Sequence, residues 1–256
     1  MKILMFDVER GSKSLGSPET IEKQFGYPVL QPTEYKNFSA LMAGLFMHKT
    51  ELVEKKVGTL VSKEVKETLV LQEGNELDVL IIDTFSELMK QKQFTISPDG
   101  KMKDFSMWGE LKTKTDELLR RLQTMRPTVI CTVHGKDVKL PDGTNKIVPN
   151  MEGSASNDMA KWFDFVFYSG TQEQTDGSMK YIWHTEHTSL HAHAKDRSGL
   201  LGSPIEQDYQ LVLNAMKEKG FESAKILIIG SPGTGKTCSL KTLLPKPKKK
   251  ANKKVA

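Results

Sequence analysis

Short apolar runs recur along the chain at spacings that suit the strands of one sheet. The clearest of them occupy residues 2–6, 77–83, 128–133 and 224–229. Runs of this kind are typical of strands that a parallel sheet buries on both faces. Residues 107–125 instead carry apolar side chains at helical spacing, and Arg126-Pro127 ends that pattern. Strands that alternate with helices predict an α/β fold with a mostly parallel central sheet and helices on both faces.

The remaining segments have weaker patterns. We expect three of them to be helices: residues 37–72, 156–163 and 205–219. We expect two others to be strands: residues 165–168, and residues 181–197, which run through a histidine-rich stretch. Pro141-Asp-Gly143 predicts a hairpin turn.

The bulk properties narrow the class of protein. The 256 residues suffice for one large α/β domain, which we place at residues 1–245. The lysine-rich residues 246–256 predict a disordered, solvated tail, with a non-specific contact to nucleic-acid phosphates as the alternative. Two cysteines, and the lack of any apolar run of about eighteen residues, predict a cytoplasmic protein with no membrane partner.

Residues 230–237 carry the most specific motif of the sequence. They read Gly-Ser-Pro-Gly-Thr-Gly-Lys-Thr and match G-x-x-x-x-G-K-[ST] at every fixed position, directly after an apolar strand. In this motif glycines let backbone N–H groups turn onto phosphates, the lysine reaches the β- and γ-phosphates, and the final hydroxyl binds Mg²⁺. The predicted ligands are ATP and Mg²⁺. We expect nine residues to bind them: Gly230, Ser231, Pro232, Gly233, Thr234, Gly235, Lys236, Thr237 and Cys238.

Such a loop needs a carboxylate nearby to hold the Mg²⁺ shell. Asp83 ends the apolar strand 77–83, so we predict that it joins Thr237 at the metal. An apolar run followed by aspartate is common in α/β proteins, and the phosphate loop is what makes the assignment specific.

Hydrolysis also needs a group that activates water. Many P-loop ATPases place a glutamate directly after this aspartate, but here the next residue is Thr84. Glu9, just past the first strand, is the best candidate, because neighbouring parallel strands open at the same edge of a sheet. A surface acid in a turn is the alternative for Glu9, and Glu87 is a weaker rival as the base.

Histidines supply further candidates. His134 follows the strand 128–133, where it can contact the γ-phosphate or the attacking water, although a plain strand-end histidine is an equal reading. His191 and His193 would share one face of the expected strand 181–197. A metal site there lacks cysteines or paired acids to complete it, so we favour a polar strand that faces a site or nucleic acid.

Lys195 and Arg197 end the same expected strand. Two cations at a sheet edge can reach the γ-phosphate of a neighbouring subunit and neutralise charge in the transition state. An exposed charged turn is the alternative.

Several of these segments together resemble the RecA superfamily, most closely the Sak-type ATPases of phages, which are linked to single-strand annealing and recombination. The resemblance lies in residues 7–9, 80–85, 128–134, 149–164, 194–197 and 230–237. It implies a RecA-like P-loop fold, Glu9 as the activating glutamate and Asp83 as the Walker B acid. It also implies Lys195 and Arg197 as a finger pair that acts across a subunit interface.

The same resemblance implies partners and a setting. The partners are single-stranded DNA, a single-strand-binding protein and further copies of the chain in a ring or filament. The setting is the bacterial host cytoplasm if the protein is phage-encoded. The choice of ATP over GTP also comes from the resemblance, since the sequence gives no clear contact for the base.

The order of the motifs departs from that family. There the phosphate loop opens the chain and the Asp-x-Glu strand follows, whereas here the loop comes last. Each motif occurs once, so a circular permutation predicts one complete ATPase. A truncated or mis-framed product is the alternative.

Two functions follow. The first is a DNA-stimulated ATPase of recombination, annealing or repair, and the alternative is a nucleotide-dependent interaction module without significant turnover. A monomeric small-molecule kinase is disfavoured, because the chain has few arginines for a lid.

Overall fold

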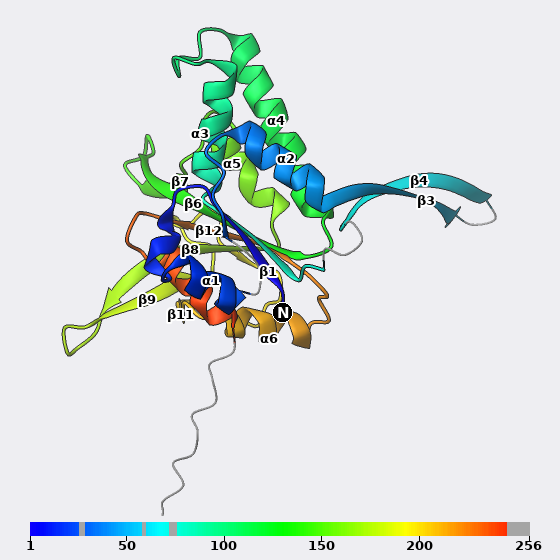
Figure 1. Ribbon diagram of the computed structural model, residues 1–256. Coiled ribbons are helices and arrows are strands. Elements are labelled where there is room, and N and C mark those ends of the chain that lie inside the picture. The colour runs from blue at the N-terminus through cyan, green and yellow to red at the C-terminus, as the bar shows by residue number, and fades with distance from the viewer. Residues whose placement is uncertain (26–28, 58–59, 72–75, 245–256) are drawn as a thin grey trace, which may run out of the picture.

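A computed structural model describes residues 1–25, 29–57, 60–71 and 76–244. At its centre lies a ten-stranded sheet in the order β11-β9-β8-β12-β6-β5-β1-β2, with β10 paired to β8 and β7 paired to β6 (Figure 1). The strands are β1 (Ile3–Asp7), β2 (Val29–Leu30), β5 (Val79–Asp83), β6 (Thr128–Lys139), β7 (Asn145–Pro149), β8 (Phe165–Glu173), β9 (Met179–His184), β10 (Lys195–Asp196), β11 (Ile205–Glu206) and β12 (Lys225–Gly230).

The middle of this sheet is parallel. The strands β8, β12, β6, β5, β1 and β2 pair in parallel, whereas β7, β9, β10 and β11 pair antiparallel with their neighbours. The strands expected from the four clearest apolar runs are confirmed. Every residue of β1, β5 and β12 is buried, as expected for strands covered on both faces. The predicted α/β class with a mostly parallel sheet is therefore correct.

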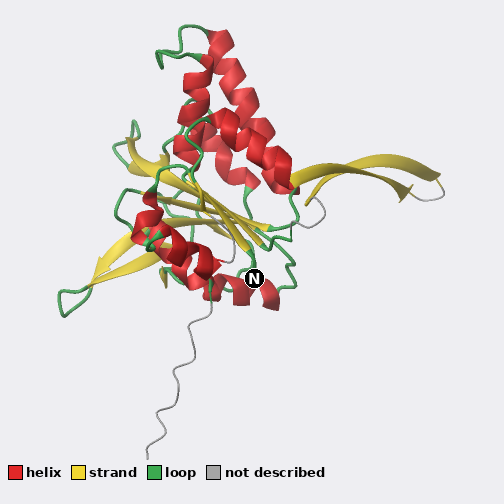
Figure 2. Ribbon diagram, in the orientation of Figure 1, coloured by secondary structure: helices red, strands yellow, loops and turns green. Residues whose placement is uncertain are grey.

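Helices cover both faces of the sheet (Figure 2). One core joins alternate strand residues such as Leu4 and Phe6 to α2, α3 and α4, and the other joins Ile3 and Met5 to α1 and α6. Alternation along each strand thus divides one apolar run between two cores. The helical segments are α1 (Pro18–Phe25), α2 (Tyr35–Leu45), α3 (Phe85–Ile96), α4 (Phe105–Thr124), α5 (Ala155–Asp158), α6 (Tyr209–Glu218), α7 (Lys236–Ser239) and the 3-10 turns η1 (Gly11–Ser14), η2 (Met159–Trp162) and η3 (Leu240–Leu243).

The segment 37–72 is not one helix, so that prediction is wrong. The helix α2 ends at Leu45, and a long antiparallel hairpin of β3 (Phe46–Val57) and β4 (Leu60–Leu71) follows it. The hairpin projects away from the body of the molecule (Figure 1). Its sequence is rich in valine, whose branched side chain favours extended backbone over helix.

Three other boundaries differ from expectation. The strand expected at 181–197 ends at His184, because the backbone and hydroxyl of Thr185 bond to the turn at Gly202–Ser203, and only the two residues of β10 are extended again. The helix expected from 205 starts at Tyr209, where Asp208 caps it. The helix expected at 156–163 is the short α5 followed by η2.

The third strand is longer than expected. It runs on to Lys139 and folds back as β7, with the predicted turn at Pro141-Asp-Gly143 between them. Gly143 has a φ of 85°, which suits glycine in a turn. The terminal lysine-rich segment 246–256 lies outside the described residues. Within the described part of the chain, no helix is long and apolar enough to cross a membrane.

Candidate functional site

The phosphate-loop motif follows β12, which lies in the middle of the sheet between β6 and β8. Two of its glycines, Gly233 and Gly235, have φ of 79° and 87°, a backbone conformation that side chains rarely adopt. The loop also packs tightly. A Cβ on Gly230 would lie 2.7 Å from Thr234 Oγ1 and 2.8 Å from Ser169 Cβ. The spacing of glycines in the motif is thus required by the backbone of the loop itself.

Lys236 points back into this loop. Its Nζ donates hydrogen bonds to the carbonyl of Gly230 at 2.7 Å and that of Ser231 at 2.9 Å, and the residue is only 6% exposed. Burial lowers its pKa, while the charges of Asp83 and Glu9 raise it. Among the described residues, no carboxylate lies within ion-pair distance of Lys236. A buried cation held by carbonyls alone fits an anionic ligand such as a triphosphate.

Asp83 and Thr237 meet although they are 154 residues apart. The Thr237 hydroxyl donates to Asp83 Oδ2 at 2.7 Å, and the Thr132 hydroxyl donates to the other carboxylate oxygen. Asp83 is buried, and burial raises its pKa against the two hydrogen bonds that lower it. A carboxylate and a hydroxyl in contact are oxygen ligands of the kind that Mg²⁺ prefers, so the residues present fit the predicted metal.

Glu9 and His134 form a second contact at the same edge of the sheet. The Glu9 carboxylate bonds to His134 Nε2, and this bond lowers the pKa of Glu9. The charge of Lys236 lowers it further, so the pair lies within electrostatic reach of the phosphate loop. His134 does not end its strand as expected: it lies where β6 leaves the central sheet to pair with β7.

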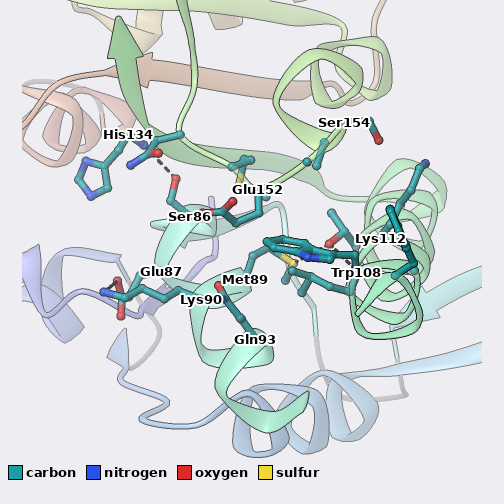
Figure 3. A pocket seen from close by; sticks show the side chains of 18 of the residues that line it. Ser86, Glu87, Met89, Lys90, Gln93, Trp108, Lys112, His134, Glu152 and Ser154 are labelled. Atoms are coloured by element: carbon teal, nitrogen blue, oxygen red, sulfur yellow. Dashed lines mark hydrogen bonds and ion pairs between the residues drawn. The ribbon is translucent and has the colours of Figure 1, made fainter. Parts of the chain in front are cut away.

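A cavity of about 730 Å³ opens beside this pair (Figure 3). Glu9 and His134 line one end of it, and α3, α4 and the segment around Met151 line the rest. Trp108 extends from α4 across the cavity, and Phe105 at the start of α4 is 94% exposed. Glu87, the rival base, lines the cavity from α3 and forms an ion pair with Lys90 at 3.5 Å.

Lys195 and Arg197 lie at the opposite edge of the sheet. The strand β10 pairs with the first residues of β8, and Arg197 Nη1 contacts Asp164 Oδ1 at 2.5 Å. Lys195 is half-buried, and its Nζ donates to the carbonyl of Ala160 at 3.4 Å. The length of β12, about 17 Å at ~3.3 Å per residue, separates this edge from the phosphate loop. Neither cation therefore joins the site of its own chain.

The expected strand face of His191 and His193 does not exist, because both lie in the irregular segment between β9 and β10. His191 instead stacks on His184, with 4.4 Å between ring centroids, and packs on Tyr168. Burial lowers the pKa of His191 to about 4. These histidines form a packing cluster rather than a polar face.

Thr132 and Gln207 had no signal in the sequence, and Asp7 had only its place in the Asp-x-Glu strand end of residues 7–9. Thr132 bonds Asp83 from the middle of β6. Gln207 donates from Nε2 to the carbonyl of Thr234 at 2.8 Å and so holds the phosphate loop. Asp7 accepts hydrogen bonds from Gly11, Ser12 and the side chain of Gln31, which orders the turn after β1. Only tertiary contacts distinguish such threonines and glutamines from the others in the chain.

A glycine-rich loop on a central parallel strand, a buried lysine and an aspartate that contacts the following threonine define a P-loop nucleotide-binding fold. Comparison with protein families agrees. A family model described as an AAA domain matches residues 1–198, and the chain belongs to this family of P-loop ATPases. ATP, with Mg²⁺, is the ligand that membership implies. The phosphate loop itself lies beyond the matched residues. No curated protein and no solved structure matches the chain.

Proposed function

We propose that this protein is a RecA-like, Mg²⁺-dependent ATPase that acts in single-strand annealing, recombination or repair of DNA. The observation that carries the proposal is the contact between Asp83 and Thr237, with Glu9 and His134 beside it. These residues come from distant parts of the sequence, yet they meet at the carboxyl edge of one sheet. Polar side chains gathered there are typical of ligand sites in α/β proteins.

Each residue would then have a distinct task. The backbone of residues 230–238 and the Lys236 ammonium bind the phosphates of the substrate. Thr237 and Asp83 would hold Mg²⁺, which neutralises charge on the phosphate oxygens. The Glu9 carboxylate is ionised at neutral pH, since its hydrogen bond with His134 lowers a pKa that is already acidic, and only the ionised form can accept a proton from water. His134 orients that carboxylate through its Nε2 hydrogen bond.

The order of motifs fits a circular permutation. The last helical segments pack against the turn that follows the first strand, where Lys241 Nζ donates to the carbonyl of Ser14 at 3.1 Å. Two elements that precede the loop in the sequence thus hold it in place: η1 contacts α7, and the Ser169 hydroxyl of β8 donates to the carbonyl of Thr234 at 2.7 Å. This packing supports a single ATPase site to which the first and last segments of the sequence both contribute.

The position of Arg197 supports action between subunits. A finger that serves a neighbouring γ-phosphate must lie away from the phosphate loop of its own chain, and Arg197 lies at the far edge of the sheet. We propose that the active form is a ring or filament on single-stranded DNA, with a single-strand-binding protein as a further partner. The cavity beside Glu9 and His134 gives a bound polymer a route to the hydrolytic residues.

Phosphate release measured with and without single-stranded DNA tests this function. We expect basal turnover that DNA increases, whereas a nucleotide-dependent switch would show neither. Light scattering after size exclusion, with and without ATP and oligonucleotide, tests the assembly.

The finger role has its own variant series. We expect Arg197→Ala to abolish the stimulation by DNA and to retain nucleotide binding. Asp164→Asn removes the ion pair of Arg197 but keeps the cation, so it should retain stimulation. Arg126→Ala is the matched control, an exposed arginine at the same edge. If Arg197→Ala and Asp164→Asn lose the stimulation by DNA to the same extent, the ion pair has only a structural role and the finger role is wrong.

A further inference from the structure

A second hollow borders the phosphate loop on the side away from Asp83. It has a volume of about 310 Å³, within the range of small-molecule sites, which begins near 300 Å³. The strand β9 forms one wall through Tyr181, and α7 and η3 form the other. The phosphate-loop motif predicted only Gly235 and Cys238 of its lining, and the sequence offered no contact for a nucleotide base.

The helical segment after the loop presents different residues to the two sides. Gly235, Cys238, Ser239 and Thr242 line the hollow, at spacings of three, four and seven residues that place them on one face. Thr237 turns to the other side, where it contacts Asp83. A triphosphate whose last phosphate lies near Thr237, Asp83 and Glu9 must therefore extend its first phosphate toward the hollow.

Tyr181 is positioned to receive a flat ring there. Its side chain is 47% exposed, and a Cβ on Gly235 would lie only 2.8 Å from its Cδ1, so the ring packs directly on the phosphate loop. Its backbone is fixed by the pairing of β9 with β8, where Tyr181 lies opposite Thr171. An exposed aromatic side chain on a fixed strand offers a stacking face at little cost in conformational entropy.

Gln207 fixes this wall relative to the loop. Its Nε2 donates to the carbonyl of Ile182 at 2.9 Å, on β9, and to the carbonyl of Thr234 at 2.8 Å, in the phosphate loop. Both partners are acceptors, so the amide nitrogen must face them. One buried amide thus couples the strand that carries Tyr181 to the loop that binds phosphate.

We propose that this hollow binds the nucleoside of a purine nucleoside triphosphate, with Tyr181 as the stacking platform for the base. The inference rests on the proposed function, since the phosphates must occupy the loop. A purine base has a larger stacking face than a pyrimidine base, so stacking on Tyr181 favours a purine. The ion pair of Lys180 and Glu206, at 3.9 Å, lines the rim and offers polar partners to the ribose.

Calorimetric titration with ATP, with CTP and with tripolyphosphate, all with Mg²⁺, tests the proposal. Tripolyphosphate carries the charge of the nucleotide but neither base nor ribose. We expect Tyr181→Ala to weaken ATP binding about 10-fold, as loss of one stacked base predicts, and to leave tripolyphosphate binding unchanged. Tyr181→Trp should retain the wild-type preference for ATP over CTP. Phe94→Ala, an exposed aromatic residue of α3, is the control.

The outcomes separate the two proposals. If wild-type protein binds neither ATP nor tripolyphosphate, the nucleotide function fails and the inference fails with it. If wild-type protein binds both and Tyr181→Ala binds ATP as tightly as wild type, only the nucleoside site is wrong. If Tyr181→Ala binds ATP and tripolyphosphate more weakly by the same factor, the nucleoside site is also overturned, because the variant would then have disturbed the phosphate loop.

Discussion

Two buried lysines lie at opposite ends of the strand that carries the phosphate loop. Lys225 begins β12, and Lys236 follows the loop beyond its other end. Both are 6% exposed, and within the described residues the side chains of both donate hydrogen bonds to backbone carbonyls alone, those of Met125 and Pro127 in the case of Lys225. Burial lowers the pKa of each, to about 8 for Lys225.

Their surroundings differ. The charge of Asp164, which binds Arg197, raises the pKa of Lys225, and the carbonyl partners of Lys225 lie in the connection between α4 and β6. Lys236 lies in a glycine-rich loop within electrostatic reach of Asp83 and Glu9, and its neighbour Gly235 lines the hollow beside Tyr181. A buried lysine with a lowered pKa is therefore no sufficient sign of function. Lys236 differs from Lys225 because two acids converge on it and because it lies in an accessible loop.

The largest expected effect comes from Lys236→Ala. We expect ATP hydrolysis to fall at least about 100-fold, because the positive charge that binds the phosphates is lost. The free energy of unfolding should change little, because removal of a buried cation is favourable and loss of its hydrogen bonds to the carbonyls of Gly230 and Ser231 is unfavourable. Turnover, nucleotide binding and urea unfolding should be measured together, with the exposed Lys219→Ala as control. A variant that still hydrolyses ATP normally would place Lys236 with Lys225 as a structural lysine.

Asp83→Asn should lower turnover by about 100-fold, and added Mg²⁺ should restore it only in part. The same substitution should also change how the free energy of unfolding depends on pH. Because burial raises the pKa of Asp83 above its ordinary 3.8, wild-type stability falls as pH rises through the interval between the two values. The Asn variant should lack that fall in pH-dependent unfolding, and Asp142→Asn, in an exposed turn, should keep it. Full activity of Asp83→Asn would contradict its metal role.

Lys225→Met should leave turnover per folded molecule unchanged and alter only stability. The folded wild type loses this proton near pH 8, whereas the unfolded chain keeps it to about pH 10.5. Wild-type stability should therefore rise between these values by as much as about 3 kcal/mol relative to the variant. Denaturant unfolding at pH 7.5 and 10.5 measures the difference. A parallel pH dependence in both proteins would contradict the burial of the cation.

The sequence predicted the elements that depend on local composition. The runs around Ile3, Leu80 and Ile226 are apolar enough to be strands in any α/β context, and the spacing of Gly230, Gly235 and Lys236 requires a particular loop. The three strands are confirmed, and Gly235 has the positive φ that glycine allows in such a loop. The position of Asp83 at the end of a strand followed from the same reasoning, because the carboxyl ends of parallel strands lie at one edge of the sheet.

Other features could not be predicted, because their local patterns are ambiguous. The charged, valine-rich segment after Leu45 suits a helix or a hairpin, and pairing between β3 and β4 decides it. Thr185 bonds to a turn almost twenty residues away, which ends a strand that the sequence alone continues. Long-range hydrogen bonds of this kind leave no periodic signal.

The sequence by itself determined the fold class and the phosphate-binding loop, because apolar runs and glycine spacing act through local backbone and burial preferences. Only the tertiary structure decided that Asp83 contacts Thr237, that Glu9 faces His134 and that Tyr181 lies against Gly235. Each of these contacts joins distant segments through strand order in the sheet. Strand order depends on how the two cores pack together, and no single segment carries it.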